Sequence, residues 1–281
     1  MLILNSLRKL LSMKSKKNVS KGLKGGFSTA VIPVALLAAI LVYVFVFGDG
    51  SNFAGGDNAG VPLPGNYFGM IYKGGFIVPI LISLMLTVIA FTVERYLAIT
   101  KAAGKGKVID FVADINDLLD NGKIDAAKES CNVQKGSVAN VIYSGLVKYQ
   151  EMEKEKTLPK DQKIVSIQKE IEEATSLELP ALEQNLVVLS TIASLATLMG
   201  LLGTVIGMIR AFSALANAGA PDSVALAAGI SEALINTALG IGTSALAIIF
   251  YNFFTTKIDK LTYSIDEGGF TIVNTFAAKN Q

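Results

Sequence analysis

The most informative residues of this sequence are polar side chains inside two long apolar stretches near its C-terminal end. Polar groups in hydrocarbon need partners, and groups of them in membrane segments are typical of ion and proton pathways. On a helix, positions 232, 236, 240 and 243 share one face and positions 233, 237 and 244 share the neighbouring face. That side of the helix is expected to face protein or water. The residues concerned are Thr204, Glu232, Asn236, Thr237, Thr243 and Ser244.

Glu232 is the only carboxylate well inside the last two apolar stretches. It lies about 13 Å along its helix from the helix start, at 1.5 Å per residue. An ionisable residue at such a depth indicates a functional role. Three roles remain open: a proton carrier, the counter-ion of a basic group, or a neutral acid packed between helices. Each Ser or Thr has a structural alternative, which is a hydrogen bond to the carbonyl four residues earlier in its own helix.

Other charged residues lie near the ends of apolar stretches. Arg210 is expected to snorkel toward the outer boundary of the membrane. Glu94 and Arg95 lie at the inner end of an earlier stretch, where we expect an interfacial anchor or an ion pair between helices.

Small residues recur at intervals of four in both C-terminal stretches. Because lipid tails are as apolar as leucine, membrane helices associate through small residues that let their backbones approach. The predicted packing positions are Gly200, Gly203, Gly207, Gly229 and Gly240. The runs GIGTSA and GLLGTVIG resemble nucleotide-binding patterns, but the first lies in an apolar helix without a preceding strand and the second lacks a Lys-Ser/Thr ending. We therefore predict no nucleotide site.

The composition favours a bilayer as the solvent. Of 281 residues, 51% are hydrophobic and 17% charged, and the mean hydropathy is +0.50. The chain has no histidine and a single cysteine, Cys131, which excludes an internal disulfide and makes a zinc cluster, a His-based relay or a catalytic triad untenable. We predict neither an enzyme nor a cofactor, and no nucleic-acid partner.

Four stretches are long and apolar enough to cross a membrane, which takes about 20 residues. They predict an all-α polytopic membrane protein with transmembrane helices at 30–47, 75–97, 186–215 and 224–254. The connections are an exposed loop rich in Gly, Asn and Pro (48–74), a charged helical region (98–185), a short turn (216–223) and a tail (255–281). The runs VIDFVADINDLLD and KIVSIQKEIEEATSLEL predict helices within the charged region. Pro180 predicts either a kink or a helix boundary before the third span.

The basic N-terminal segment sets the expected orientation. Residues 1–29 carry seven Lys and Arg before the first acid, Asp49. Basic residues favour the cytoplasmic side, so both termini and residues 98–185 are expected there, and residues 48–74 and 216–223 on the periplasmic side. The first span would otherwise be a cleaved signal peptide, but the long basic region and the lack of an A-x-A pattern favour an anchor. Attraction to anionic membrane lipid is a secondary role of these charges.

The last two spans resemble the MotA/TolQ/ExbB proton channel family, most closely its ExbB/TolQ branch. The resemblance rests on the run GLLGTVIGM, on ISEALINTALGI, and on the long segment between the second and third spans; it covers residues 178–260 closely and VERYLAIT more loosely. The extra N-terminal span departs from the three-span pattern of ExbB, but a helix that begins inside preserves the orientation of the rest. We expect it at the lipid-facing periphery.

This resemblance implies an inner-membrane subunit that forms a homopentamer, with the last two helices lining a pore. It implies a dimer of one-span partners of the ExbD/TolR type inside that pore, which supply the proton-carrying aspartate. Thr204 and Thr237 would line the pore opposite that aspartate, with Glu232 near the same path, while Asn236, Thr243 and Ser244 would support it. Proton entry would drive a motion transmitted to a TonB- or TolA-like protein acting at the outer membrane.

Other functions remain as alternatives. Within the family these are a TolQ-like subunit for envelope maintenance and a flagellar or gliding stator. Outside it, a structural membrane scaffold would use the small residues for packing only. A secondary transporter is disfavoured because the sequence has no inverted repeat and few polar residues in its spans.

Overall fold

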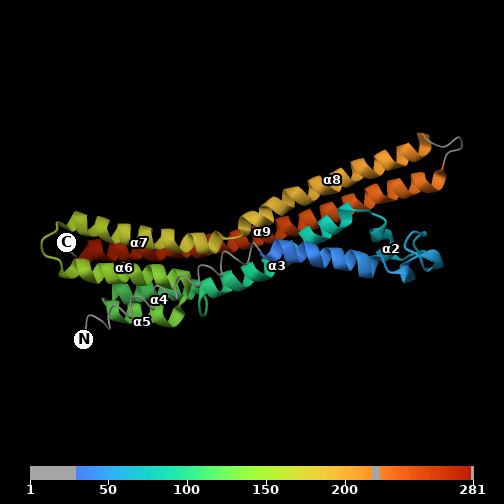
Figure 1. Cartoon of the computed structure of the whole chain (residues 1–281). Coiled ribbons are helices and arrows are strands. Elements are labelled where there is room, and N and C mark those ends of the chain that lie inside the picture. Colours follow the sequence, from blue (N-terminus) through green and yellow to red (C-terminus); the bar gives the residue numbers. More distant parts are fainter. Residues whose placement is uncertain (1–29, 217–221, 280–281) are drawn as a thin grey trace, which may run out of the picture. The chain divides into compact units, whose positions relative to one another are not determined.

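The computed structural model describes residues 30–216 and 222–279 (Figure 1). Within these ranges the chain is helical and has no strand, only an isolated bridge between Phe53 and Pro62. The predicted all-α fold is confirmed. The basic segment 1–29 and most of the predicted turn 216–223 lie outside the described residues.

In the described part of the chain, four helices are long and apolar enough to cross a membrane, as predicted. The first is Ala30–Phe47, which ends in the π-helical turns η1 (Val42–Phe47). The other three spans lie within α3 (Ile77–Ala103), α8 (Leu186–Ala216) and α9 (Ser223–Lys279). Two of them run on beyond the predicted spans. No Gly or Pro interrupts α3 between Pro79 and Gly104, and α9 contains no proline, so nothing local ends either helix at the membrane surface.

The segment after the first helix is more ordered than the expected exposed loop. It contains the short helices η2 (Gly50–Asn52), η3 (Ala54–Gly56) and α2 (Tyr67–Tyr72). Asn52 is buried, and its side-chain amide donates to the carbonyl of Val46 at 2.8 Å. The Tyr43 hydroxyl donates to the carbonyl of Tyr72 at 2.9 Å, and the two rings stack. These contacts hold the loop against the end of the first helix.

The chain divides into two compact units. The first comprises residues up to Phe91 together with Val188–Ile248, and the second comprises Thr92–Val187 together with the chain from Ile249 onward. In the first unit, the buried residue Ala39 of the N-terminal helix packs with Val78 and Ile82 of α3. The opposite side of that helix exposes large apolar residues such as Val34, Leu37 and Phe45. The lipid-facing position of this helix at the periphery of the assembly stays a prediction.

The second unit is a helical bundle built around the C-terminal half of α9. It contains α4 (Val108–Asp120), α5 (Ile124–Gln134), α6 (Gly136–Lys154) and α7 (Lys160–Glu183). Both helices predicted from the charged region are present, as α4 and as part of α7. Figure 1 shows α6 and α7 beside the red end of α9. There Tyr149 meets the ring of Phe276 edge-on at 5.0 Å, and Gly145 lies against Ile171 and Ile272.

Candidate ion-path residues of the α8–α9 pair

Glycines allow α8 and α9 to approach closely within the first unit. A Cβ built on Gly240 would lie 2.6 Å from the backbone oxygen of Ala196, and one on Gly207 would lie 2.7 Å from the backbone nitrogen of Ala233. Across the same two helices, a Cβ on Gly229 would lie 2.7 Å from the backbone nitrogen of Ala211, one on Gly200 would lie 3.0 Å from the backbone oxygen of Asn236, and one on Gly203 would meet the side chain of Asn236. At Gly207, Gly229 and Gly240 a larger residue would require the facing backbone to move, which is the geometry expected of small-residue packing in membranes.

The hydroxyls of Thr204 and Thr237 meet across this helix contact. Their Oγ1 atoms are hydrogen-bonded to each other, and each also lies near the carbonyl oxygen of Gly200, at 3.2 Å and 3.5 Å. Gly200 is four residues before Thr204, so Thr204 also follows the ordinary pattern of a helix threonine. Thr237 does not, because both of its contacts reach α8. Both residues are half-buried, so this hydroxyl pair lies at the edge of the helix contact.

Glu232 has a partner within the chain. Nη1 of Arg210 on α8 lies 2.6 Å and 2.9 Å from the two carboxylate oxygens of Glu232 on α9. The Glu232 side chain is 8% exposed and that of Arg210 is 53% exposed. Arg210 therefore does more than snorkel to a boundary, and the counter-ion role left open by the sequence has a geometric basis.

The three polar support residues have different surroundings. Asn236 is fully buried and donates its side-chain amide to the carbonyl of Gly74 at 2.8 Å, while its Oδ1 has no hydrogen-bond partner among the described residues. Ser244 donates to the backbone carbonyl of Ala193 on α8. Thr243 is buried. Asn236 and Ser244 thus join α9 to other elements of the first unit instead of bonding their own helix.

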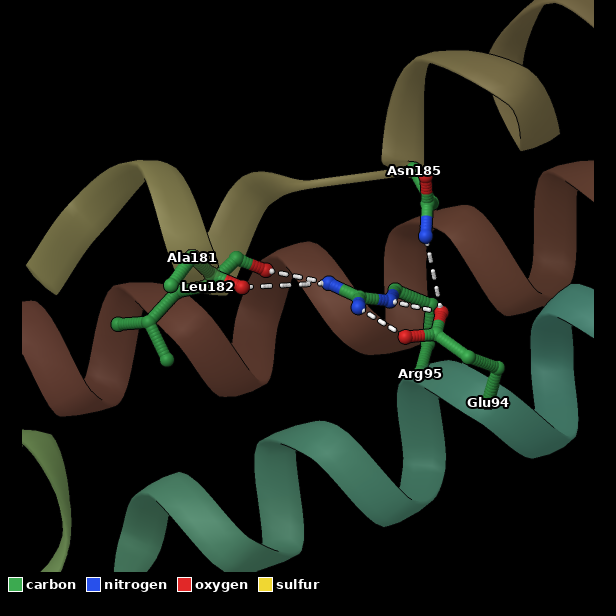
Figure 2. Close-up of polar contacts among 5 residues, drawn as sticks. All are labelled: Glu94, Arg95, Ala181, Leu182 and Asn185. Atoms are coloured by element: carbon green, nitrogen blue, oxygen red, sulfur yellow. Dashed lines mark hydrogen bonds and ion pairs between the residues drawn. The ribbon is translucent and has the colours of Figure 1, made fainter. Parts of the chain in front are cut away.

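A second polar cluster lies in the other unit, where α7 ends and α8 begins (Figure 2). Arg95 is 2% exposed, donates its Nε to Glu94 at 2.6 Å, and directs Nη1 at the carbonyls of Ala181 and Leu182 at 3.5 Å and 3.1 Å. Asn185, with a positive φ of 68°, donates to Glu94 at 3.3 Å. Because the last carbonyls of a helix lack partners within it, Arg95 supplies the missing donor.

Glu94 and Arg95 pair with each other, and Arg95 also connects α3 with the end of α7. Pro180 lies inside α7, which ends three residues later at Glu183, and α8 begins at Leu186, so a helix boundary follows the proline.

Sequence reasoning missed the partners of Glu232 and Asn236. Arg210 lies six residues before the end of α8, and Glu232 nine residues after the start of α9. The sequence did contain a signal for the ion pair, because these opposite charges lie at similar depths in two helices that are joined by a short connection. No comparable signal marked the turn at Gly74 and Gly75. Among the described residues, no group of His, Cys, Asp or Glu side chains is placed to hold a metal ion.

Comparison with known proteins supports the resemblance seen in the sequence. Residues 135–267 match the model of the MotA/TolQ/ExbB proton channel family. The chain is 37% identical over 86 residues to a biopolymer transport protein, ExbB-like 3, of a Synechocystis species, covering 30% of this chain and 41% of that protein. It is 30% identical over 124 residues to the Tol-Pal system protein TolQ of Pseudomonas aeruginosa, covering 44% and 54%.

A third relative is the biopolymer transport protein ExbB of Pseudomonas putida, 41% identical over 71 residues, which are 25% of this chain and 22% of that protein. Each match thus covers less than two thirds of the relative. Relatives named ExbB and relatives named TolQ both occur, so the matches point to the proton channel family but do not distinguish its ExbB branch from its TolQ branch.

Proposed function

We propose that the chain is a channel subunit of a proton-driven motor in a bacterial inner membrane, because residues 135–267 match the model of the MotA/TolQ/ExbB proton channel family. In the ExbB-like form of this proposal, the motor energises TonB-dependent transport across the outer membrane. The N- and C-termini are cytoplasmic, in keeping with the basic residues of segment 1–29 and with Lys257 and Lys260 after the last span.

The observation that carries the proposal is the hydroxyl pair of Thr204 and Thr237. It lies within the family-matched region, at the half-exposed edge of two tightly packed membrane helices. Beside it lies a shallow, open depression of about 610 Å³ on the surface of α8, between Thr204 and Ala216, lined mostly by apolar side chains that include Met208 and Phe212. Hydroxyls beside an exposed apolar surface suit the wall of an ion path that receives a partner helix.

The wall by itself lacks a free proton carrier. Glu232 is the only carboxylate in the membrane parts of α8 and α9, and it is paired with Arg210. We therefore assign the proton-carrying carboxylate to a second protein, a one-span partner of the ExbD/TolR type, present as a dimer inside a homopentamer of this chain. Large apolar side chains exposed on α8 and α9, among them Leu198, Val205 and Leu234, provide surface for neighbouring copies, for the partner and for lipid.

Threonine-to-valine substitutions test the proposed path. Valine keeps the shape of threonine and removes the hydroxyl. Thr204→Val and Thr237→Val should each lower proton flux in vesicles that contain the chain and its partner, with the larger loss at Thr237, whose hydroxyl is not bonded within its own helix. The matched control is Thr87→Val, because Thr87 is a buried threonine of α3 whose hydroxyl donates to the carbonyl of Ser83.

The same experiment separates a channel from a scaffold. A scaffold that uses its small residues only for packing would lose no flux or motor output specifically at positions 204 and 237. Equal activity of both variants, at normal expression and assembly, would refute the assignment of the hydroxyl pair to the path.

A TolQ-like role in envelope maintenance is the second candidate, favoured by the TolQ match, which is longer than the two ExbB-type matches described above. Expression of the chain in strains that lack either TolQ or ExbB distinguishes the two. Restored outer-membrane integrity supports the TolQ-like role, and restored TonB-dependent uptake supports the ExbB-like role. A flagellar or gliding stator predicts restored motility instead.

A further inference from the structure

The Arg210–Glu232 ion pair is joined to a third element of the same unit. The turn between α2 and α3 brings Gly75, at φ +78°, so close to the pair that a Cβ there would lie 2.5 Å from Oε1 of Glu232 and 3.5 Å from Nη1 of Arg210. The preceding residue, Gly74, accepts the hydrogen bond from Asn236, one helical turn from Glu232. Three elements therefore meet at one polar point: α8, α9 and the turn before α3.

Charge and burial decide what this point can do. A buried charge that loses its partner is left uncompensated, which is strongly unfavourable in a low-dielectric surrounding. Glu232 is almost fully buried and has Arg210 as its close cation, so the two together enter the membrane as a neutral unit. A carboxylate in this state is held in place by its partner and by the turn beside it.

We propose that Arg210, Glu232 and the Gly74–Gly75 turn form a latch that fixes the α8–α9 pair to the start of α3. In this latch, which we place within the proposed channel subunit, Glu232 is a positioning residue that serves as the counter-ion of Arg210 and does not carry the proton. Gly75 is required for two reasons. Its positive φ would strain any other residue, and a side chain at this position would lie against the carboxylate of Glu232.

Charge-neutralising substitutions test the pairing through stability, which does not depend on ion flow. Arg210→Gln and Glu232→Gln each leave one unpaired charge, and each should lower the folded-to-unfolded ratio of the detergent-extracted chain by about tenfold, a discounted value because Arg210 is half-exposed. The double variant Arg210→Gln with Glu232→Gln should lose less than either single variant. Losses that simply add in the double variant would overturn the latch.

A matched glycine pair tests the third element. Gly65 also has φ +78° but has nothing within 4 Å of a built Cβ, so Gly65→Ala reports backbone strain alone. Gly75→Ala should destabilise the chain more than Gly65→Ala does, and the excess should disappear in a Glu232→Ala background, where the carboxylate is gone. An equal effect of the two glycine substitutions in the unchanged chain would contradict the contact.

Proton flux then distinguishes positioning from proton carriage. If Glu232 is a counter-ion, Glu232→Gln lowers flux and the added Arg210→Gln restores it, because the unpaired charge has been removed. If Glu232 carries the proton, every variant without this carboxylate loses flux, and a well-folded but inactive double variant would overturn the proposal. If the unsubstituted chain with its partner conducts no protons, the proposed channel function is contradicted. The latch is then tested by the stability measurements alone.

Discussion

The contact between α8 and α9 predicts opposite outcomes for two glycines that are two residues apart. A Cβ at Gly240 would lie 2.6 Å from a backbone oxygen of α8, whereas ordinary contacts begin at 3.4 Å, so α9 must move by up to 0.8 Å to accept Gly240→Ala. Overpacking of this kind costs about 1–3 kcal/mol. A Cβ at Gly242 meets nothing within 4 Å, and alanine is favoured over glycine inside a helix by about 1 kcal/mol.

Unfolding of the two variants in mild detergent measures this difference. Gly240→Ala should lower the folded-to-unfolded ratio by up to about 30-fold, because the overpacking cost of about 1–3 kcal/mol is partly offset by the helix preference of alanine, about 1 kcal/mol. Gly242→Ala should leave this ratio unchanged or raise it. The native mass, measured in parallel, separates the stability of the single chain from packing between copies. If a neighbouring copy packs against Gly242, the added alanine side chain would reduce assembly without weakening the single chain. Equal stability of the two variants would refute the close approach of α8 and α9.

Three further predictions concern the second unit. Arg95→Met should destabilise the chain by about 1–3 kcal/mol, because it removes the donor to the last carbonyls of α7 and leaves the Glu94 carboxylate with Asn185 as its remaining donor. Proteolysis between α7 and α8 should accelerate, and unchanged cleavage there would exclude a role for Arg95 at this junction. Burial raises the pKa of the Cys131 thiol to about 12, so the thiol stays protonated at pH 8 and should react with iodoacetamide only after unfolding; rapid labelling of the folded chain would contradict its burial. Burial also raises the pKa of Tyr149, and its hydroxyl has no hydrogen-bond partner in the described part of the chain. Tyr149→Phe should therefore leave the free energy of unfolding unchanged or raise it by about 1–3 kcal/mol in a denaturation experiment. A clear loss of stability would contradict the absence of a partner for this hydroxyl.

Local sequence patterns were sufficient to predict the four spans and two helices of the charged region. Apolar length marked the four spans, and helical periodicity marked α4 and α7. The small residues at Gly200 and Gly240 indicated a helix contact, since close packing in membranes depends on residue size. The structure adds which helix each glycine faces.

Contacts between distant residues explain what the sequence did not reveal. Arg210 reaches Glu232 across a helix hairpin, and Asn236 reaches the carbonyl of Gly74, 162 positions away. A backbone carbonyl or a glycine turn leaves no mark in the composition that would identify its partner. The length of α9 was also missed, because its C-terminal part is less apolar and is supported by packing of residues such as Phe276 within the second unit.

The native mass of the complex extracted from its own membrane tests the proposed function most directly. We predict that the chain copurifies with a small one-span membrane protein and that the mass corresponds to several copies of this chain, five in the proposed assembly, with two copies of the partner. A chain that remains a monomer and retains no partner under conditions that preserve its fold would contradict the proposed channel subunit.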